Sequence, residues 1–166
     1  MLNKIVMNAK NHWIIAVFFL LTFFSAGGGT VESFVNYPTW RLIGEAEFRA
    51  FHQALSPRIV VTMVIPLLLS TIFNGLLFWF RPLAIPRWSV WATLLLALLI
   101  WVSSALIEIP IQTELDESGF SREAIERLIA TDLPFRTVPG YLRLALSFWM
   151  LLLALRNVPA RKEPVL

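Results

Sequence analysis

Long apolar runs divided by short polar connections are the dominant pattern along this sequence of 166 residues. A helix needs about 20 mostly apolar residues to cross the hydrocarbon core of a bilayer. Pro110 predicts the end of the third run, because a proline disfavours helical geometry in the residue before it. The fourth run is uninterrupted only from Leu144 to Leu155, so its helix must begin near Val138 and draw Arg143 below the membrane surface. The predicted spans are residues 13–35, 59–80, 88–108 and 138–156.

The two connections on the side away from the termini carry helical patterns of their own. Residues 40–55 follow Thr39, a good N-cap residue, and place apolar and charged side chains on opposite sides of a helix. Residues 121–131 begin with the capping residue Ser121, and Leu133-Pro134 predicts their end. We expect both segments to lie on the membrane or to cap the bundle. The predicted fold is all-α: a four-helix transmembrane bundle with two short amphipathic helices in the outer connections, forming one integral membrane domain over residues 1–166.

Composition supports this interpretation and excludes several classes of protein. The chain is 57% apolar and 15% charged, with a mean hydropathy of +0.69, whereas a soluble domain carries roughly 25% charged residues. The sequence has no cysteine, which excludes disulfide frameworks and cysteine-ligated metal sites. Its only histidines are His12 and His52, so a multi-histidine haem or copper centre is not expected. We expect no cofactor, and we expect the lipid bilayer rather than nucleic acid as the partner.

The formal net charge of +3 divides unevenly between the two sides of the predicted bundle. Seven basic residues and one acidic residue lie on the side of the termini, and seven basic and ten acidic residues lie on the other. Basic residues in short loops mark the cytoplasmic side. The two sides have equal numbers of basic residues, but those on the side of the termini lie in short tails and in the tight turn at residues 81–87. We therefore expect both termini in the cytoplasm and the protein in a bacterial inner membrane. Lys4, Lys10 and the small residues 25–27 also fit a signal peptide, but the length of the apolar run favours a membrane helix.

Polar and small side chains recur at helical spacing on each predicted span. Such residues are costly against lipid, so we expect these stripes to face the interior of the bundle, where they pair or line a cavity. No internal sequence repeat relates the four spans. The stripes comprise Thr22, Ser25, Gly29, Glu32 and Asn36 on the first span, Thr62, Pro66, Ser70 and Asn74 on the second, Trp101, Ser104 and Glu108 on the third, and Arg136, Gly140, Arg143 and Ser147 on the fourth.

The ionisable members of the stripes lie toward the outer ends of the spans, which predicts a polar pocket in the outer half of the bundle. The segment around His52 would cover this pocket as a lid. Glu32, His52 and Glu108 are the predicted catalytic residues, because carboxylate and imidazole groups are common proton donors and acceptors. The predicted ligand is a small apolar or amphipathic molecule. The residues expected to contact it are Tyr37, Trp40, Arg58, Gln112, Arg136 and Arg143.

Other interpretations of the same residues stay open. Glu32, His52 and Glu108 could bind a divalent metal, although they lie on separate segments and form no compact motif. Glu32 and Glu108 could instead pair with Arg143 and Arg136 to lock the helices together without any chemistry. The protein would then be a non-enzymatic accessory protein or a homo-oligomer. A transporter or channel is less favoured, because no inverted repeat is present.

Three local segments, together with the four-span architecture, resemble the anthrone-oxygenase-like group of small membrane proteins. The segments are AGGGTVESFVNYPTW at residues 26–40, FRAFHQ at residues 48–53 and TDLPFRTVPGYLR at residues 131–143. The resemblance extends over nearly the whole chain and is mainly architectural. It implies a four-helix membrane bundle and a cofactor-independent oxygenation of a planar aromatic compound, and it assigns no catalytic residue.

Overall fold

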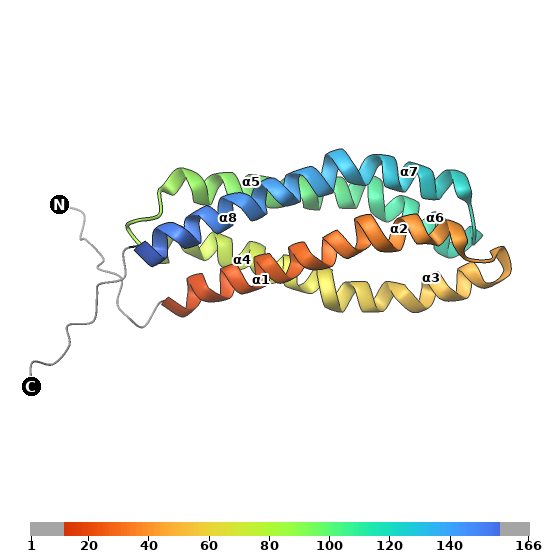
Figure 1. Ribbon diagram of the computed structural model, residues 1–166, viewed down its shortest axis with the longest axis horizontal. Helices are drawn as coiled ribbons and strands as arrows, with labels where there is room; N and C mark the ends of the chain where they lie inside the picture. The colour runs from red at the N-terminus through yellow and green to blue at the C-terminus, as the bar shows by residue number, and fades with distance from the viewer. Residues whose placement is uncertain (1–11, 157–166) are drawn as a thin grey trace, which may run out of the picture.

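The computed structural model describes residues 12–156 as four long helices joined by three turns (Figure 1). These residues contain no strand. The first long helix contains α1 (His12–Val31), η2 (Glu32–Asn36), α2 (Tyr37–Thr39) and η3 (Trp40–Leu42), and the second contains α3 (Glu45–Ile59), η4 (Val60–Val64) and α4 (Ile65–Phe80). The third contains α5 (Arg87–Ser103), η5 (Ser104–Glu108) and α6 (Ile109–Ser118), and the fourth contains α7 (Arg122–Asp132), η6 (Leu133–Thr137) and α8 (Val138–Arg156).

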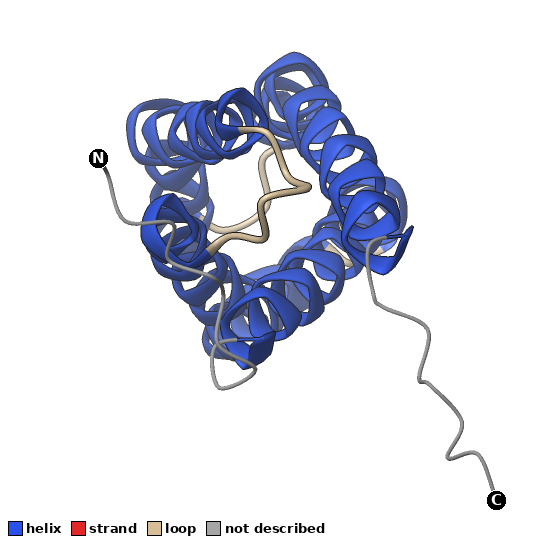
Figure 2. Cartoon of the chain, turned by 90° about the vertical axis from the view of Figure 1, so that its left-hand side faces the viewer, coloured by secondary structure: helices blue, strands red, loops and turns tan. Residues whose placement is uncertain are grey.

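The long helices form an antiparallel bundle with a square cross-section (Figure 2). α1 packs against α4 and α8, and α5 packs against the same two helices. The turns at residues 43–44 and 119–121 lie at one end, which we call the distal end. The turn at residues 81–86 lies at the other end, the terminal end, together with residues 12 and 156 (Figure 1). The predicted all-α four-helix bundle is confirmed.

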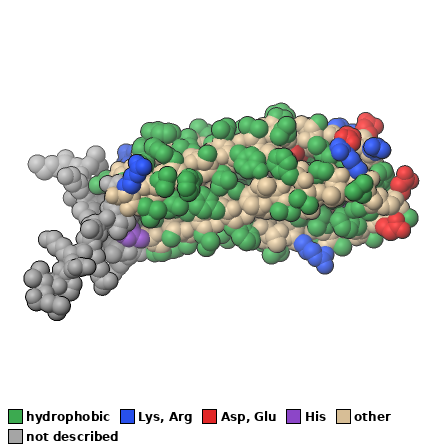
Figure 3. Space-filling model, viewed as in Figure 1, with side chains coloured by type: hydrophobic (Ala, Val, Ile, Leu, Met, Phe, Trp, Pro, Cys, Tyr) green, Lys and Arg blue, Asp and Glu red, His purple; other side chains and the backbone are tan. Residues whose placement is uncertain are grey.

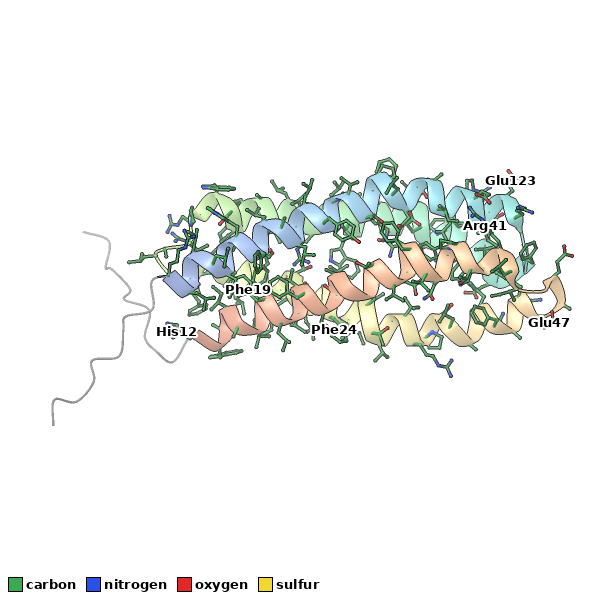
Figure 4. The ribbon with its side chains drawn as sticks, in the orientation of Figure 1. His12, Phe19, Phe24, Arg41, Glu47 and Glu123 are labelled. Atoms are coloured by element: carbon green, nitrogen blue, oxygen red, sulfur yellow. The ribbon has the colours of Figure 1, made fainter. Side chains whose placement is uncertain are left out.

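Each long helix is long and apolar enough to cross a membrane. The four contain 31, 36, 32 and 35 residues, and the mean hydropathy of their most apolar windows lies between 1.6 and 2.3. Apolar side chains cover the flank of the bundle (Figure 3), and charged residues such as Arg41, Glu47 and Glu123 lie at the distal end (Figure 4). Because about 20 residues suffice to cross a bilayer core, part of each helix must extend beyond it.

The two predicted amphipathic helices are not separate elements, so that part of the prediction is wrong. Residues 40–55 are divided by the turn before α3, and Thr39 lies inside the first long helix, where its hydroxyl donates to the carbonyl oxygen of Asn36 at 2.9 Å. Ser121 does cap α7, since its side chain accepts from the N–H of Ala124 at 3.2 Å. However, α7 continues into α8 through η6. The segment around His52, which was predicted to be a lid, lies in α3, and α3 continues without a break through η4 into α4.

Prolines that were expected to end helices lie inside them. A proline has no N–H and deprives the carbonyl four residues earlier of its donor. In each long helix a five-residue π segment comes directly before a residue followed by proline, and the N–H of that residue bonds to the carbonyl oxygen five residues earlier. Local π turns of this kind let a helix continue past a proline. The four prolines that follow the π segments are Pro38, Pro66, Pro110 and Pro139.

Two apolar cores hold the ends of the bundle. On the first long helix, the buried apolar side chains between positions 14 and 19 belong to the terminal core and those of Tyr37 and Trp40 to the distal core, with buried polar side chains between the two cores. The site therefore lies between two packed ends. The terminal core comprises Ile14, Ile15, Phe18, Phe19, Leu77, Ile85, Val90 and Met150, and the distal core comprises Tyr37, Trp40, Phe48, Ile111, Leu115, Ala124, Ile125 and Leu128.

Gly28 marks a close approach of the first long helix to the second, near the level of the π segments. A Cβ at Gly28 would lie 3.4 Å from the carbonyl oxygen of Thr62 and 3.5 Å from the Cβ of Met63. A Cβ at Gly27 would meet nothing within 4 Å. Small residues permit such close helix packing. Gly28 therefore sets the spacing of the two helices beside the site.

Candidate functional site

A cavity of about 310 Å³, which we call the outer chamber, lies between the two cores. Every π segment contributes a side chain to its wall: Glu32 from η2, Met63 from η4, Glu108 from η5 and Arg136 from η6. π turns are rare and recur at functional sites. Much of the remaining wall is apolar, formed by Leu55, Ile59, Val60, Val64, Leu67 and Ile109.

Arg136 is the centre of the polar network in this chamber, and its side chain is only 12% exposed. Its Nη1 donates to the hydroxyl of Tyr37 at 3.0 Å, and lies 3.5 Å from Asp132 Oδ1 and 3.7 Å from Glu108 Oε2. Its Nη2 lies 4.0 Å from the sulfur of Met63. Buried charges persist when they are paired in this way, because an isolated one is very costly.

Glu108 has hydrogen-bonding capacity that nothing in the described part of the chain uses. The residue is 1% exposed, and neither of its carboxylate oxygens has a hydrogen-bond partner there. The distance of 3.7 Å to Arg136 is that of an ion pair and exceeds a hydrogen bond. The hydroxyl of the neighbouring Thr131 donates instead to the carbonyl oxygens of Arg127 and Leu128. Glu108 can therefore accept a donor from a ligand.

Glu32 lines the same chamber but has a fixed partner. Asn36, one turn further along the helix, donates from Nδ2 to Glu32 Oε1 at 2.5 Å. Glu32 and Glu108 place two buried carboxyl groups at the wall of this chamber, near the guanidinium of Arg136, and the third buried carboxyl group, that of Asp132, pairs with Arg136 from outside this wall. Carboxylates repel anions and accept hydrogen bonds. The outer chamber therefore favours a ligand that donates hydrogen bonds over one that carries negative charge.

His52 is held on both sides of its ring, and no glutamate lies among its hydrogen-bond partners. Its Nδ1 lies 2.7 Å from Asp116 Oδ1, and its Nε2 lies 2.7 Å from Gln112 Oε1. The ring also packs against Trp40 and Phe48, with ring centroids 4.8 and 5.6 Å apart. With both ring nitrogens engaged, His52 orients Gln112 at the chamber wall instead of offering a free base.

A smaller cavity of about 80 Å³, the inner chamber, lies next to the outer chamber. The two share Met63, Leu67 and Arg136 as lining residues. Arg143 lines the inner chamber and donates from Nη2 to Ser70 Oγ at 3.0 Å. Within residues 12–156 no carboxylate lies at ion-pair distance from Arg143. The predicted pairing of Arg143 with a glutamate is therefore wrong, whereas the pairing of Glu108 with Arg136 is present.

The outer chamber brings together seven of the predicted residues and leaves out two. Arg58 is exposed and donates to the carbonyl oxygen of Ala54 on its own helix, and Arg143 lies in the inner chamber. In the part of the chain that the structure describes, no group of three or more histidine and acidic side chains is placed to hold a metal ion. The described residues therefore give no support to the alternative in which Glu32, His52 and Glu108 bind a metal. The residues brought together are Glu32, Tyr37, Trp40, His52, Glu108, Gln112 and Arg136.

Two acidic residues of the site were missed. Asp132 pairs with Arg136 and accepts from the hydroxyl of Thr137 at 2.7 Å, and Asp116 pairs with His52. Asp132 precedes Arg136 by four residues, a spacing that places both on one helical face. That signal was present, but Pro134 was interpreted as a helix end between them.

Comparison of the sequence with protein-family models and with curated proteins, and of the fold with solved structures, gave no match.

Proposed function

We propose that this chain is an integral protein of a bacterial inner membrane, and that its outer chamber binds a small amphipathic molecule carrying a hydrogen-bond donor. The observation that supports this proposal best is Glu108, which is buried at a largely apolar wall and, apart from its ion pair with Arg136, has no hydrogen-bond partner for either oxygen among the described residues. A volume of about 310 Å³ lies at the lower end of the range of ligand pockets, roughly 300–1,000 Å³. The ligand's apolar body would contact the aliphatic wall, and its donor would face Glu108.

We also propose that both termini face the cytoplasm. Arg81, Arg87 and Arg156 lie at the terminal end, and most acidic residues lie at the distal end. This distribution supports the orientation through the rule that basic residues in short loops stay inside. In this orientation the distal end lies on the outer side of the membrane, and the outer chamber would open toward that side.

The orientation can be checked by labelling introduced cysteines, because the chain has none of its own. Ser118→Cys, exposed at the distal end, is expected to react with a membrane-impermeant maleimide in intact cells. Leu83→Cys, at a position 75% exposed in the turn at the terminal end, is the matched control and should react only after lysis. The opposite pattern would invert the proposed orientation.

The ligand class can be tested with 1-naphthol, which has a hydroxyl donor, and naphthalene, which has none. We expect 1-naphthol to raise the Tm of the purified full chain in nonionic detergent, saturably and more than naphthalene does. Glu108→Gln should weaken 1-naphthol binding about tenfold or more, since a hydrogen bond to a charged group contributes ~1.5–3 kcal/mol. Its effect on naphthalene should be small.

Two further variants make this test specific to the chamber. Glu126→Gln makes the same chemical change on an exposed carboxylate that pairs with Arg41 at 2.6 Å, and it should leave binding unchanged. Ser104→Leu places a larger side chain in the chamber wall and should abolish binding of both probes. Equal responses of the wild type and Glu108→Gln, or no saturable response to either probe, would contradict the proposal. The accessory-protein interpretation would then be preferred.

As a catalytic form of this function we propose a cofactor-independent oxygenase, supported by Glu108 as a proton acceptor whose oxygens have no hydrogen-bond donor among the described residues. Glu108 would take a proton from the ring methylene of an anthrone-type compound. Dioxygen would then oxidise that carbon to a ketone, with one oxygen atom entering the product and the other leaving as water. Oxygen consumption with anthrone, measured on the same samples, distinguishes an oxygenase from a protein that only binds the ligand. Binding without consumption would retain the binding protein and reject the enzyme.

A further inference from the structure

Arg143 carries a buried charge that has no carboxylate at ion-pair distance within residues 12–156. The residue is 3% exposed, and its one hydrogen-bond partner in the structure is the hydroxyl of Ser70. Its Nε has no partner in the described residues, and the guanidinium carbon lies 6.0 Å from the ring centroid of Phe18. Burying an unpaired charge costs several kcal/mol. A bound anion would remove much of that cost.

A second unpaired donor faces the same space. The hydroxyl oxygen of Thr22 on α1 is buried with no hydrogen-bond partner among residues 12–156, and both Thr22 and Arg143 line the inner chamber. The other hydroxyls of that wall include Ser25 and Thr30, which donate to carbonyl oxygens of their own helix. Two helices thus each present one unused donor to one cavity.

The size and charge of the two chambers restrict what the inner one can hold. About 80 Å³ exceeds the 10–15 Å³ that one water requires, so the space admits a few non-hydrogen atoms. An anion would avoid the outer chamber, where Glu32 and Glu108 line the wall around Arg136. The inner chamber is lined by the carboxylate of Asp132, but that group is paired with Arg136 and accepts from the hydroxyl of Thr137. An anion there would therefore meet the guanidinium of Arg143. Planar guanidinium groups bind carboxylates and other small oxyanions well.

We propose that the inner chamber is a binding site for a small monovalent anion, held by Arg143 and Thr22. Its chemistry fits either a free inorganic anion or the carboxylate of a ligand whose apolar part occupies the outer chamber, which borders it at Met63, Leu67 and Arg136. Only the ligand carboxylate rests on the proposed function. The anion site itself is inferred from the buried donors of Arg143 and Thr22 that have no partner among the described residues.

The site is tested by titrating chloride, nitrate and acetate into the purified full chain, kept in gluconate buffer at constant ionic strength. We expect at least one of these anions to raise the Tm saturably, by about 3 °C or more. Arg143→Met should abolish this response, and its Tm in gluconate should equal or exceed that of the wild type, because an unpaired buried charge has been removed. Arg87→Met, which changes an exposed arginine, should keep the response.

Thr22→Val gives a second, milder test in case Arg143→Met does not fold, and it should weaken anion binding at least threefold. No saturable response in the wild type, a response that persists in Arg143→Met, or an anion affinity that is unchanged in Thr22→Val would overturn the proposal. Hexanoate distinguishes the two sources. If hexanoate binds at least tenfold more tightly than acetate, the site holds a ligand's carboxylate; equal affinities indicate a free anion. The 1-naphthol response should survive in Arg143→Met, so failure here does not count against the outer chamber.

Discussion

Replacing Arg136 with methionine is expected to lower the free energy of unfolding by about 3–5 kcal/mol, the range measured when one partner of a buried ion pair is removed. The guanidinium lies at hydrogen-bond or ion-pair distance from Tyr37, Asp132 and Glu108, and methionine would leave all three without it. For a chain of this size the Tm should fall by on the order of 10 °C. Thermal unfolding in detergent, followed by circular dichroism, measures the change.

The matched control is Arg127→Met, which removes an arginine of the distal end that pairs with Glu114 and with Glu123. These groups are solvent-exposed, so the loss should stay below about 1 kcal/mol. Glu108→Gln should also cost little, because Arg136 keeps Asp132 and Tyr37 as partners. If Arg136→Met and Arg127→Met lower the Tm equally, Arg136 is not the centre of the network.

Truncating Trp40 to alanine should destabilise the chain by a similar amount, about 3–5 kcal/mol. Trp40 is 2% exposed and its ring packs against Tyr37, Phe48 and His52, with centroids 5.0, 6.1 and 4.8 Å away. The lost ring would join the outer chamber to a new void in the distal core. Chemical or thermal unfolding of the detergent-solubilised protein measures this loss.

Trp40→Phe separates packing from hydrogen bonding at the same position. The indole N–H of Trp40 is buried and has no partner in residues 12–156, so phenylalanine forfeits no hydrogen bond. We expect a loss below about 1.5 kcal/mol. A loss as large as that of Trp40→Ala would show that the indole nitrogen has an essential partner, such as a water or a ligand in the outer chamber.

The bundle and most of its polar lining could be predicted from the sequence, because lipid penalises polar groups strongly. Trp101, Ser104 and Glu108 were placed on one inward stripe by spacing alone, and all three line the outer chamber. Arg136 was assigned to the same interior for the same reason. Both predictions hold although Ser104 and Glu108 lie in η5 and Arg136 lies in η6, because the three- and four-residue spacing of the stripe tolerates the wider turn there.

Periodicity failed on the second long helix. Thr62 was assigned to the inward stripe, but it is exposed and donates to the carbonyl oxygen of Arg58, which is exposed as well. Met63 faces the chamber in place of Thr62. The π segment η4 explains this exchange of Thr62 and Met63. Its turn contains one extra residue, so on the distal side of η4 the inward-facing positions are displaced by one residue along the sequence. The sequence signal for this turn was Pro66, which lies two residues after η4, but a proline at that position was not interpreted as the mark of a π turn.

The partners of individual buried groups were also beyond sequence reasoning. Arg143 was expected to meet a glutamate, because opposite charges are the usual solution for a buried arginine. Its neighbours are instead Ser70 from α4 and Phe18 from α1. Which residues meet depends on the rotation of each helix about its axis, and that rotation is set by packing across the whole bundle.

The four π segments also govern how the bundle tolerates insertions and deletions. One residue of an α-helix corresponds to about 100° of rotation about the axis, but the wide turn at η4 holds one extra residue without turning the two halves of the helix against each other. Deleting a residue within η4 would therefore restore an ordinary turn and leave both halves facing the same neighbours. A deletion in an ordinary turn of α4 would instead rotate one half by about 100° and turn its inward stripe away from the chambers.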